Sequence, residues 1–228
     1  MATLERRALP TRWGRIVLWS IPYLVVGLVQ ALSVRVLSIE AFDTDGPSME
    51  PTLLDGDRFV VDKSAYGLTL PFSELASEHW ADPQPGDVVV LRSPADHVDI
   101  VKRVIGVAGD RIEIRDDVVF RNGEAIQQRI LGPCVPDAST EDTTDCEWVE
   151  EGIATQRWRT SRSLLSVPES MPELVVPEGA VFVLGDHRDR SNDSRNPRIG
   201  CVAVERIRGR ALAIYWSEMA GRAGTWIP

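Results

Sequence analysis

The sequence predicts a mostly β domain with long loop excursions, preceded by one N-terminal transmembrane helix. Residues 16–34 carry no charge and are rich in Val, Leu and Ile. Beyond them, short runs of β-branched residues alternate with turns, and neither of the two long excursions shows a convincing helical period. A chain of 228 residues has room for one anchor and one substantial domain.

Residues 16–34 form the predicted anchor. Nineteen helical residues span about 28 Å, close to the hydrocarbon thickness of about 30 Å. Four arginines precede this run and only Arg35 follows it closely. This bias predicts that residues 1–15 are cytoplasmic and that residues 40–228 form an extracytoplasmic domain. A cleaved signal peptide is the alternative, although residues 34–38 offer no clean small-x-small cleavage site.

The β domain is predicted from its short apolar runs. The expected strands are residues 58–61, 88–91, 98–105, 111–114, 118–120, 181–184 and 210–216. Asn122-Gly123 after the fifth of these runs is typical of a tight hairpin. The excursions at about 64–85 and 132–177 are expected to be loops, apart from one or two helical turns at 73–80.

Charge and cysteine content limit the function classes. Beyond residue 40, 32 acidic residues outnumber 20 basic ones, so nucleic-acid binding is not expected. Cys134 and Cys146 bracket a polar loop, and export would permit a disulfide between them, with chance placement as the alternative. Cys201 is left over. The three histidines are far apart and no metal-binding motif is present, so neither a metal nor another cofactor is expected.

Lysine is rare in this chain. Twenty-three of the 25 basic residues are Arg, and only Lys63 and Lys102 are Lys. Read as a strand, residues 98–105 place Lys102 on a face whose other members are apolar. Burial on that face would lower the pKa of the amine toward neutrality and provide a general base, a role that Arg cannot fill. A surface lysine placed by chance is the alternative.

Four short motifs follow the predicted anchor in order. They are Ser48-Met49-Glu50-Pro51-Thr52-Leu53, then Gly56–Lys63, then Gly86–Val90 with Val101–Gly106 and Gly109–Ile112, and finally Gly185–Arg195. Together they resemble the sequence boxes of bacterial type I signal peptidases, the Ser-Lys peptidases of family S26. The resemblance covers roughly residues 40–125 and 175–217 and leaves the excursion at about 132–177 poorly matched.

The resemblance implies a membrane-bound serine endopeptidase that removes N-terminal signal peptides from exported preproteins. It implies Ser48 as the nucleophile and Lys102 as the general base, in a Ser-Lys variant of triad logic. Gly46 stands where some members carry a hydroxyl side chain, so the backbone N–H of Ser48 is the expected oxyanion donor. Lys63 is expected to be structural.

The final motif implies supporting roles. By resemblance, Ser191 helps to orient the lysine amine. Polar residues that buttress the site, or that form ordinary surface ion pairs instead, are Asp186, Asp193, Arg195 and Arg103. His187 stands where Asn is usual, and its place beside Asp186 invites a Ser-His-Asp interpretation, which the lysine match disfavours.

The implied substrates are exported preproteins with small residues at positions −1 and −3, bound as an extended strand. The implied location is the bacterial cytoplasmic (inner) membrane, with a single pass, contact with membrane lipid and a monomeric chain. Tyr215, Trp216 and Trp226 are candidates for seating the domain at the interface, with core packing as the alternative.

Two other functions compete with this one. One is a different membrane-tethered Ser-Lys peptidase; a penicillin-binding protein would carry the lysine three residues after the serine, where this chain has Pro51. The other is a non-catalytic peptide-binding β-domain, whose activity would not depend on Ser48 or Lys102.

Overall fold

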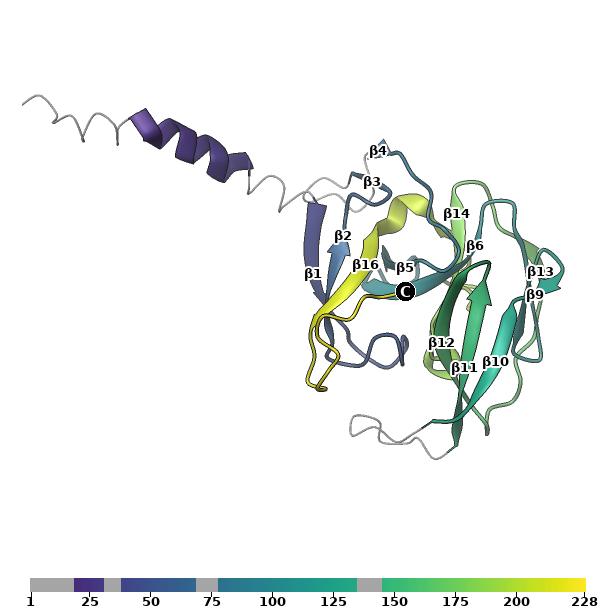
Figure 1. The fold of residues 1–228 in the computed structure, drawn as a ribbon. Helices are drawn as coiled ribbons and strands as arrows, with labels where there is room; N and C mark the ends of the chain where they lie inside the picture. The colour runs from purple at the N-terminus through teal and green to yellow at the C-terminus, as the bar shows by residue number, and fades with distance from the viewer. Residues whose placement is uncertain (1–18, 31–37, 69–77, 135–144) are drawn as a thin grey trace, which may run out of the picture.

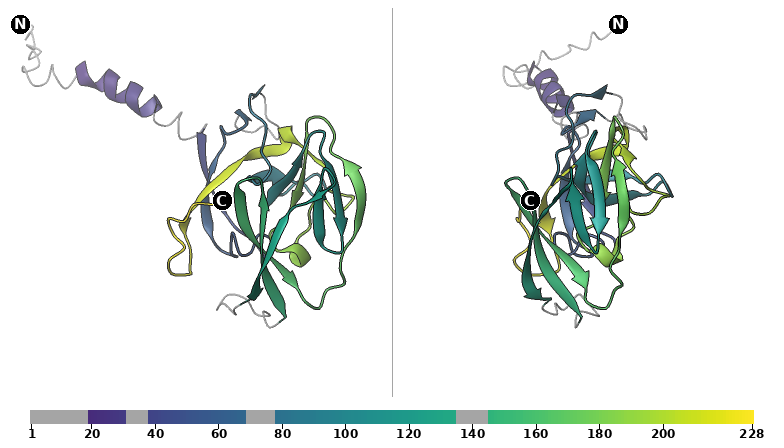
Figure 2. Two further views of the ribbon diagram at one scale, coloured as in Figure 1. Left: turned by 45° about the vertical axis from the view of Figure 1, so that its right-hand side comes forward. Right: turned by 90° about the vertical axis from the view of Figure 1, so that its right-hand side faces the viewer.

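The computed structural model describes residues 19–30, 38–68, 78–134 and 145–228. Residues 19–30 are helical and lie apart from the strands, as the views in Figures 1 and 2 agree. Within the described ranges, no helix combines the length and apolarity that crossing a membrane requires. The rest of the predicted anchor, residues 16–18 and 31–34, lies outside those ranges.

The main body is an antiparallel sheet of seven strands in the order β1-β2-β16-β5-β6-β14-β15. Its strands are β1 Ile39–Asp43, β2 Arg58–Asp62, β5 Val88–Arg92, β6 Asp99–Val107, β14 Ala180–Leu184, β15 Val202–Ala203 and β16 Ile207–Trp216. Segments that are far apart in sequence therefore meet in one sheet, and β6 lies between β5 and β14.

Three smaller sheets and two short 3-10 helices complete the described fold. The four-stranded sheet contains β13 Met171–Val175, β7 Arg111–Arg115, β8 Val118–Arg121 and β9 Glu124–Ala125. The three-stranded sheet contains β10 Gln127–Pro133, β11 Cys146–Ile153 and β12 Gln156–Ser163. The remaining elements are the pair β3 Gly67–Leu68 and β4 Glu78–His79, and the helices η1 Arg188–Arg190 and η2 Val204–Arg206.

The mostly β prediction is confirmed, and each expected strand has a counterpart in the structure. The expectation for the excursion at 132–177 is wrong, because this stretch contains β11, β12 and β13. Buried polar residues in β11 and β12 interrupt the apolar alternation that would have indicated strands. Residues 78–79, expected in a helical turn, form β4, while residues 73–77 lie outside the described ranges.

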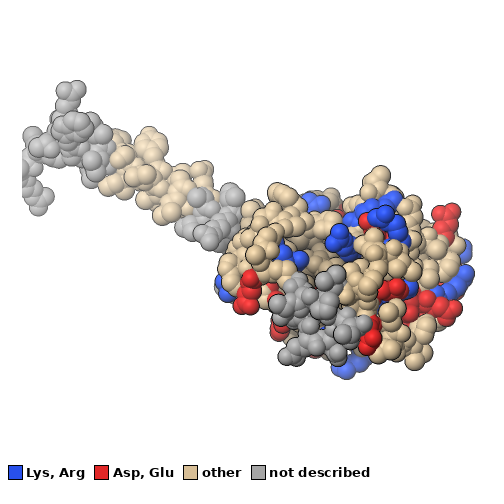
Figure 3. Space-filling view, turned by 60° about the horizontal axis from the view of Figure 1, so that its bottom comes forward, with Lys and Arg blue, Asp and Glu red and all other residues tan. Residues whose placement is uncertain are grey.

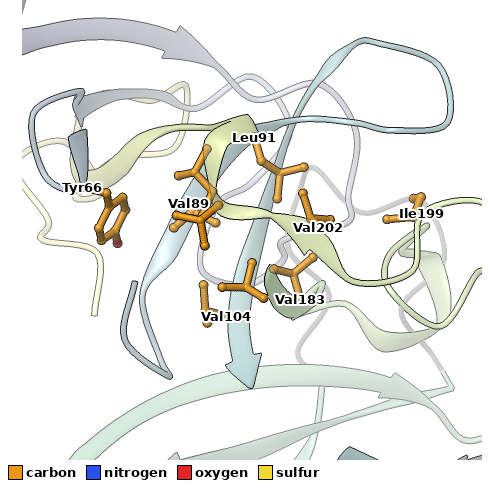
Figure 4. Packing of buried hydrophobic residues seen from close by; sticks show 10 residues of the cluster. Tyr66, Val89, Leu91, Val104, Val183, Ile199 and Val202 are labelled. Carbon is orange, nitrogen blue, oxygen red and sulfur yellow. The ribbon is translucent and has the colours of Figure 1, made fainter. Parts of the chain in front are cut away.

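Both faces of β5 and β6 are buried. Val89, Leu91 and Val104 belong to one apolar cluster, shown in Figure 4, whereas Val88 and Val90 belong to another on the opposite face. Burial on both faces explains the continuous apolar run at 88–91. Lys102 and Arg103 of β6 are therefore buried.

Figure 3 shows how charge is distributed on one face of the molecule. Basic and acidic side chains are interspersed on the β domain, while the described helix carries none. The charged groups that matter for the site are inside the domain.

Candidate active site

The segment around Ser48 is anchored by its apolar neighbours. Met49 and Leu53 are fully buried in the cluster that also contains Phe59 and Val88. The segment forms a hydrogen-bonded turn, in which the Leu53 N–H donates to the Met49 carbonyl at 3.0 Å. Ser48 itself is half-buried at the edge of this packing, so the core fixes the position of its hydroxyl.

Lys102 reaches Ser48 from the middle of β6. Its Nζ donates hydrogen bonds to the Ser48 Oγ at 2.8 Å and to the Val101 carbonyl at 2.7 Å. Lys102 is 3% exposed. Burial lowers the pKa of the amine from its ordinary value to about 8, although Asp193 and Asp186 oppose this shift. An amine with this pKa is partly neutral near pH 7 and can accept a proton.

A buried ion pair contacts the segment that carries Ser48. Arg103 is fully buried and donates to both carboxylate oxygens of Asp186, at 2.8 and 2.7 Å. The Thr52 hydroxyl donates to the same carboxylate at 2.5 Å. The Arg103 guanidinium also lies 4.8 Å from the ring centroid of Trp158. These contacts join the Ser48 segment, β6, β12 and the loop after β14.

Asp193 and Arg195 form a second ion pair. Arg195 donates to both oxygens of Asp193 at 2.8 Å, and Asp193 accepts from the Gly185 N–H at 3.0 Å. The pair thus stabilises the loop that follows β14. Arg195 also donates to Glu169 at 2.7 Å, which ties this loop to the segment before β13.

Ser191 lies where Gly185 and Ser48 approach each other. A Cβ atom on Gly185 would lie 2.2 Å from the Ser191 Oγ and 2.4 Å from the Ser48 carbonyl oxygen. The Ser191 hydroxyl is buried and has no hydrogen-bond partner among the described residues. Its expected role in orienting the lysine amine therefore stays a prediction.

Ser48 and Lys102 open into a cleft of about 290 Å³. Gly46, Ile100 and Ile199 also line this cleft. A Cβ atom on Gly46 would meet nothing within 4 Å, so this position faces open space. In the described part of the chain, the Ser48 N–H donates to no backbone carbonyl.

The three-stranded sheet contacts the loop that follows β14. Glu151 of β11 is buried and accepts a hydrogen bond from Arg188 at 2.8 Å within a two-point ion pair. The Ser161 N–H of β12 donates to the Asp186 carbonyl at 2.9 Å. The excursion thus packs against the loop between β14 and Ser191.

The other residues that were singled out from the sequence make contacts apart from the Ser48–Lys102 pair. Cys134 and Cys146 form a disulfide, while Cys201 is a half-buried free thiol. Lys63 pairs with Glu40 at 3.1 Å. His187 lies next to the Glu50 carboxylate, and among the described residues this is its one ion pair.

Sequence reasoning missed several residues of the site. Glu50 and Thr52 lie within the first motif, so their place there was a usable signal. Trp158 lies in the poorly matched excursion and carried no sequence signal. Gly185 opens the final motif, but its tight contacts depend on the folded structure.

Comparisons with known proteins match most of the chain to signal peptidases. The family model described as signal peptidase, peptidase S26, matches residues 16–216. A signal peptidase I of Pseudomonas fluorescens is 36% identical over 198 residues, covering 82% of this chain and 68% of the relative. One from Bacillus licheniformis is 28% identical over 193 residues, covering 85% of each chain. A solved signal peptidase I from Enterococcus faecalis is 30% identical and covers 57% of this chain and 97% of its own, with a TM-score of 0.34.

Proposed function

The chain belongs to the signal peptidase family, peptidase S26, and we propose that it is a membrane-bound serine endopeptidase that removes signal peptides from exported preproteins. The observation that carries the proposal is the 2.8 Å contact between the buried Lys102 Nζ and the Ser48 Oγ. A nucleophile within hydrogen-bond reach of a base with a lowered pKa is the arrangement that acyl transfer requires.

Acylation begins with neutral Lys102. Its amine accepts the Ser48 proton as Oγ attacks the scissile carbonyl carbon. The Ser48 N–H then stabilises the negative charge on the carbonyl oxygen. Protonated Lys102 gives its proton to the leaving amine, the C–N bond breaks, and the mature protein departs.

Deacylation repeats these steps with water. Neutral Lys102 accepts a proton from a water molecule, whose oxygen attacks the ester carbonyl of the acyl-enzyme. The ester C–O bond breaks, Ser48 regains a proton, and the signal peptide leaves with a free carboxyl group. One group therefore acts as base and acid in turn.

Buried ion pairs support this chemistry by fixing the three segments that meet at the site. The Arg103–Asp186–Thr52 contacts hold the nucleophile segment against β6. The Asp193–Arg195 pair holds the loop after β14. Rigid placement matters because small displacements of reacting groups reduce the rate strongly.

We propose substrates with small residues at −1 and −3, bound as an extended strand in the cleft. A cleft of about 290 Å³ with isoleucine side chains in its wall suits short apolar groups. We place the enzyme in the bacterial cytoplasmic membrane with its N-terminus in the cytoplasm and the peptidase domain outside. Tyr215, Trp216 and Trp226 are exposed, which suits contact with the lipid interface.

The test is cleavage of a model preprotein by the wild-type chain and by Ser48→Ala, Lys102→Ala and Lys102→Arg variants. We expect all three variants to lose activity and a chelator to have no effect. Cleavage retained in Lys102→Arg would refute the neutral-amine mechanism, because Arg keeps its proton. Activity that persists in both alanine variants would refute the dyad.

A further inference from the structure

We propose that Glu50 and His187 are a pair of positioning residues that fix the nucleophile segment against the loop after β14. This positioning role is additional to the roles of Ser48 and Lys102, and its effect on catalysis rests on the proposed function. Neither side chain touches the reacting atoms; each acts through Ser48.

The first observation is the burial of both side chains. Glu50 is 5% exposed and His187 is 9% exposed. Their closest approach is 3.6 Å, between the His187 Nδ1 and the Glu50 Oε2. Within the described ranges, this is the only ion pair of the Glu50 carboxylate, and the buried Nδ1 has no hydrogen-bond partner. A buried carboxylate is costly without a counter-charge, so each side chain is the other's available partner.

The second observation is that the main chain of His187 is bonded to the turn that contains Glu50. The His187 N–H donates to the carbonyl of Ser48 at 3.1 Å. Glu50 lies two residues after Ser48, in the same turn, where its N–H donates to the Pro47 carbonyl at 3.0 Å. The side-chain pair therefore acts on a turn whose main chain is already attached to His187.

The third observation is that β12 contacts the main chains of both Glu50 and His187. The Ser161 hydroxyl donates to the Glu50 carbonyl at 3.3 Å, and Ser161 forms an isolated parallel bridge with His187. The turn that carries the nucleophile, the loop that carries Ser191 and the three-stranded sheet thus meet at the pair. A change in the pair would shift Ser48 relative to Lys102, which lies on a different element, β6.

The test is a double-mutant cycle with Glu50→Gln, His187→Asn and the combined variant. We expect each single variant to reduce kcat by about tenfold and to leave KM within about twofold, because the pair positions the nucleophile rather than the substrate. The combined variant should be no slower than the slower single variant, since the second change removes a contact that is already lost. Single effects that multiply in the combined variant would overturn the pairing.

The control is the exposed pair of His79 and Asp82, whose side chains approach within 3.0 Å and do not line the cleft. His79→Asn should leave kcat and KM unchanged. A loss in His79→Asn equal to that in His187→Asn would overturn the proposal, because it would show a general effect of losing an imidazole.

A spectroscopic readout separates this proposal from the proposed function. The imidazole nitrogens of His187 should change their ¹⁵N shifts in Glu50→Gln, and the Ser48 amide should shift in both single variants. The chain has three histidines, so His79→Asn and His97→Asn assign the signals. An unchanged His187 or Ser48 signal overturns the proposal even where preproteins are cleaved. A wild-type chain that cleaves no preprotein refutes the proposed function, while the spectra still decide the pair. If Glu50→Gln fails to fold, the shift of the Ser48 amide signal in His187→Asn decides whether the pair positions Ser48.

Discussion

Replacement of Gly185 by alanine should disable the enzyme by pushing apart two segments of the active site. The added Cβ would lie 2.2 Å from the Ser191 Oγ and 2.4 Å from the Ser48 carbonyl oxygen. Relaxed carbon–oxygen contacts are about 3.3 Å or longer, so the segments must separate by roughly 1 Å. The Ser48 carbonyl is backbone and also accepts from the His187 N–H, so it cannot rotate away.

A displacement of about 1 Å costs on the order of 100-fold in rate, or about 2.7 kcal/mol of activation free energy. Overpacking should also lower the free energy of unfolding by about 1–3 kcal/mol. For a chain of this size, each kcal/mol lowers the Tm by about 2–4 °C. The fold should therefore survive while the chemistry is strongly slowed.

The assay is steady-state cleavage of a model preprotein at several concentrations, with the Tm measured in the same detergent. The matched control is Gly27→Ala, because a Cβ on Gly27 would meet nothing within 4 Å. We expect normal kcat in the control and a kcat about 100-fold lower in Gly185→Ala. A Gly185→Ala enzyme with near-normal kcat would refute the argument that this close approach positions Ser48.

Three further predictions concern the Lys102 base and the disulfide. Since the pKa of Lys102 is lowered to about 8, kcat/KM should rise about tenfold per pH unit below that value and level off above it. Because the unfolded amine keeps its proton to a higher pH, the stability of the wild-type chain should also rise with pH above about 8, and the Lys102→Met variant should lose that rise. A flat pH–rate profile would contradict the role of base. Removing the Cys134–Cys146 bridge with paired serines should lower the free energy of unfolding by about 3 kcal/mol, seen in denaturant titration, and leave kcat unchanged. Cys201→Ser is the control, and an equal loss of stability there would contradict a specific effect of the bridge.

The sequence allowed five of the seven strands of the main sheet to be predicted from apolar runs bounded by turns, whereas β1 and β15 were not expected. Val88–Val90 is such a run, and both of its faces are buried. In contrast, β11 contains Glu147, Glu150 and Glu151, which read as solvated loop. Glu151 is buried beside Arg188, which is far away in sequence and neutralises it, and it also accepts a hydrogen bond from Gln128. A strand whose core residue is charged cannot be recognised without its partner.

The site shows the same division. The candidates Ser48 and Lys102 were proposed from a motif and from strand alternation, and the structure brings their side chains together across 54 positions of sequence. Trp158 gave no such signal, and the place of Glu50 in the first motif did not indicate its partner, because the importance of both residues depends on what faces them after folding. Patterns along the chain predict elements, whereas contacts between loops need the three-dimensional structure.

The buried contact between Glu151 and Arg188 has a consequence for how this family can vary in length. The three-stranded sheet supplies the anion that pairs with a buried cation of the loop after β14. Removing the Glu151 carboxylate would leave the guanidinium of Arg188 without this partner, and breaking a buried pair in this way costs about 3–5 kcal/mol. A relative that lacks this sheet is therefore expected to carry an uncharged residue at the position of Arg188, or a new acid beside it. We expect the three-stranded sheet and the loop that carries Arg188 to vary together.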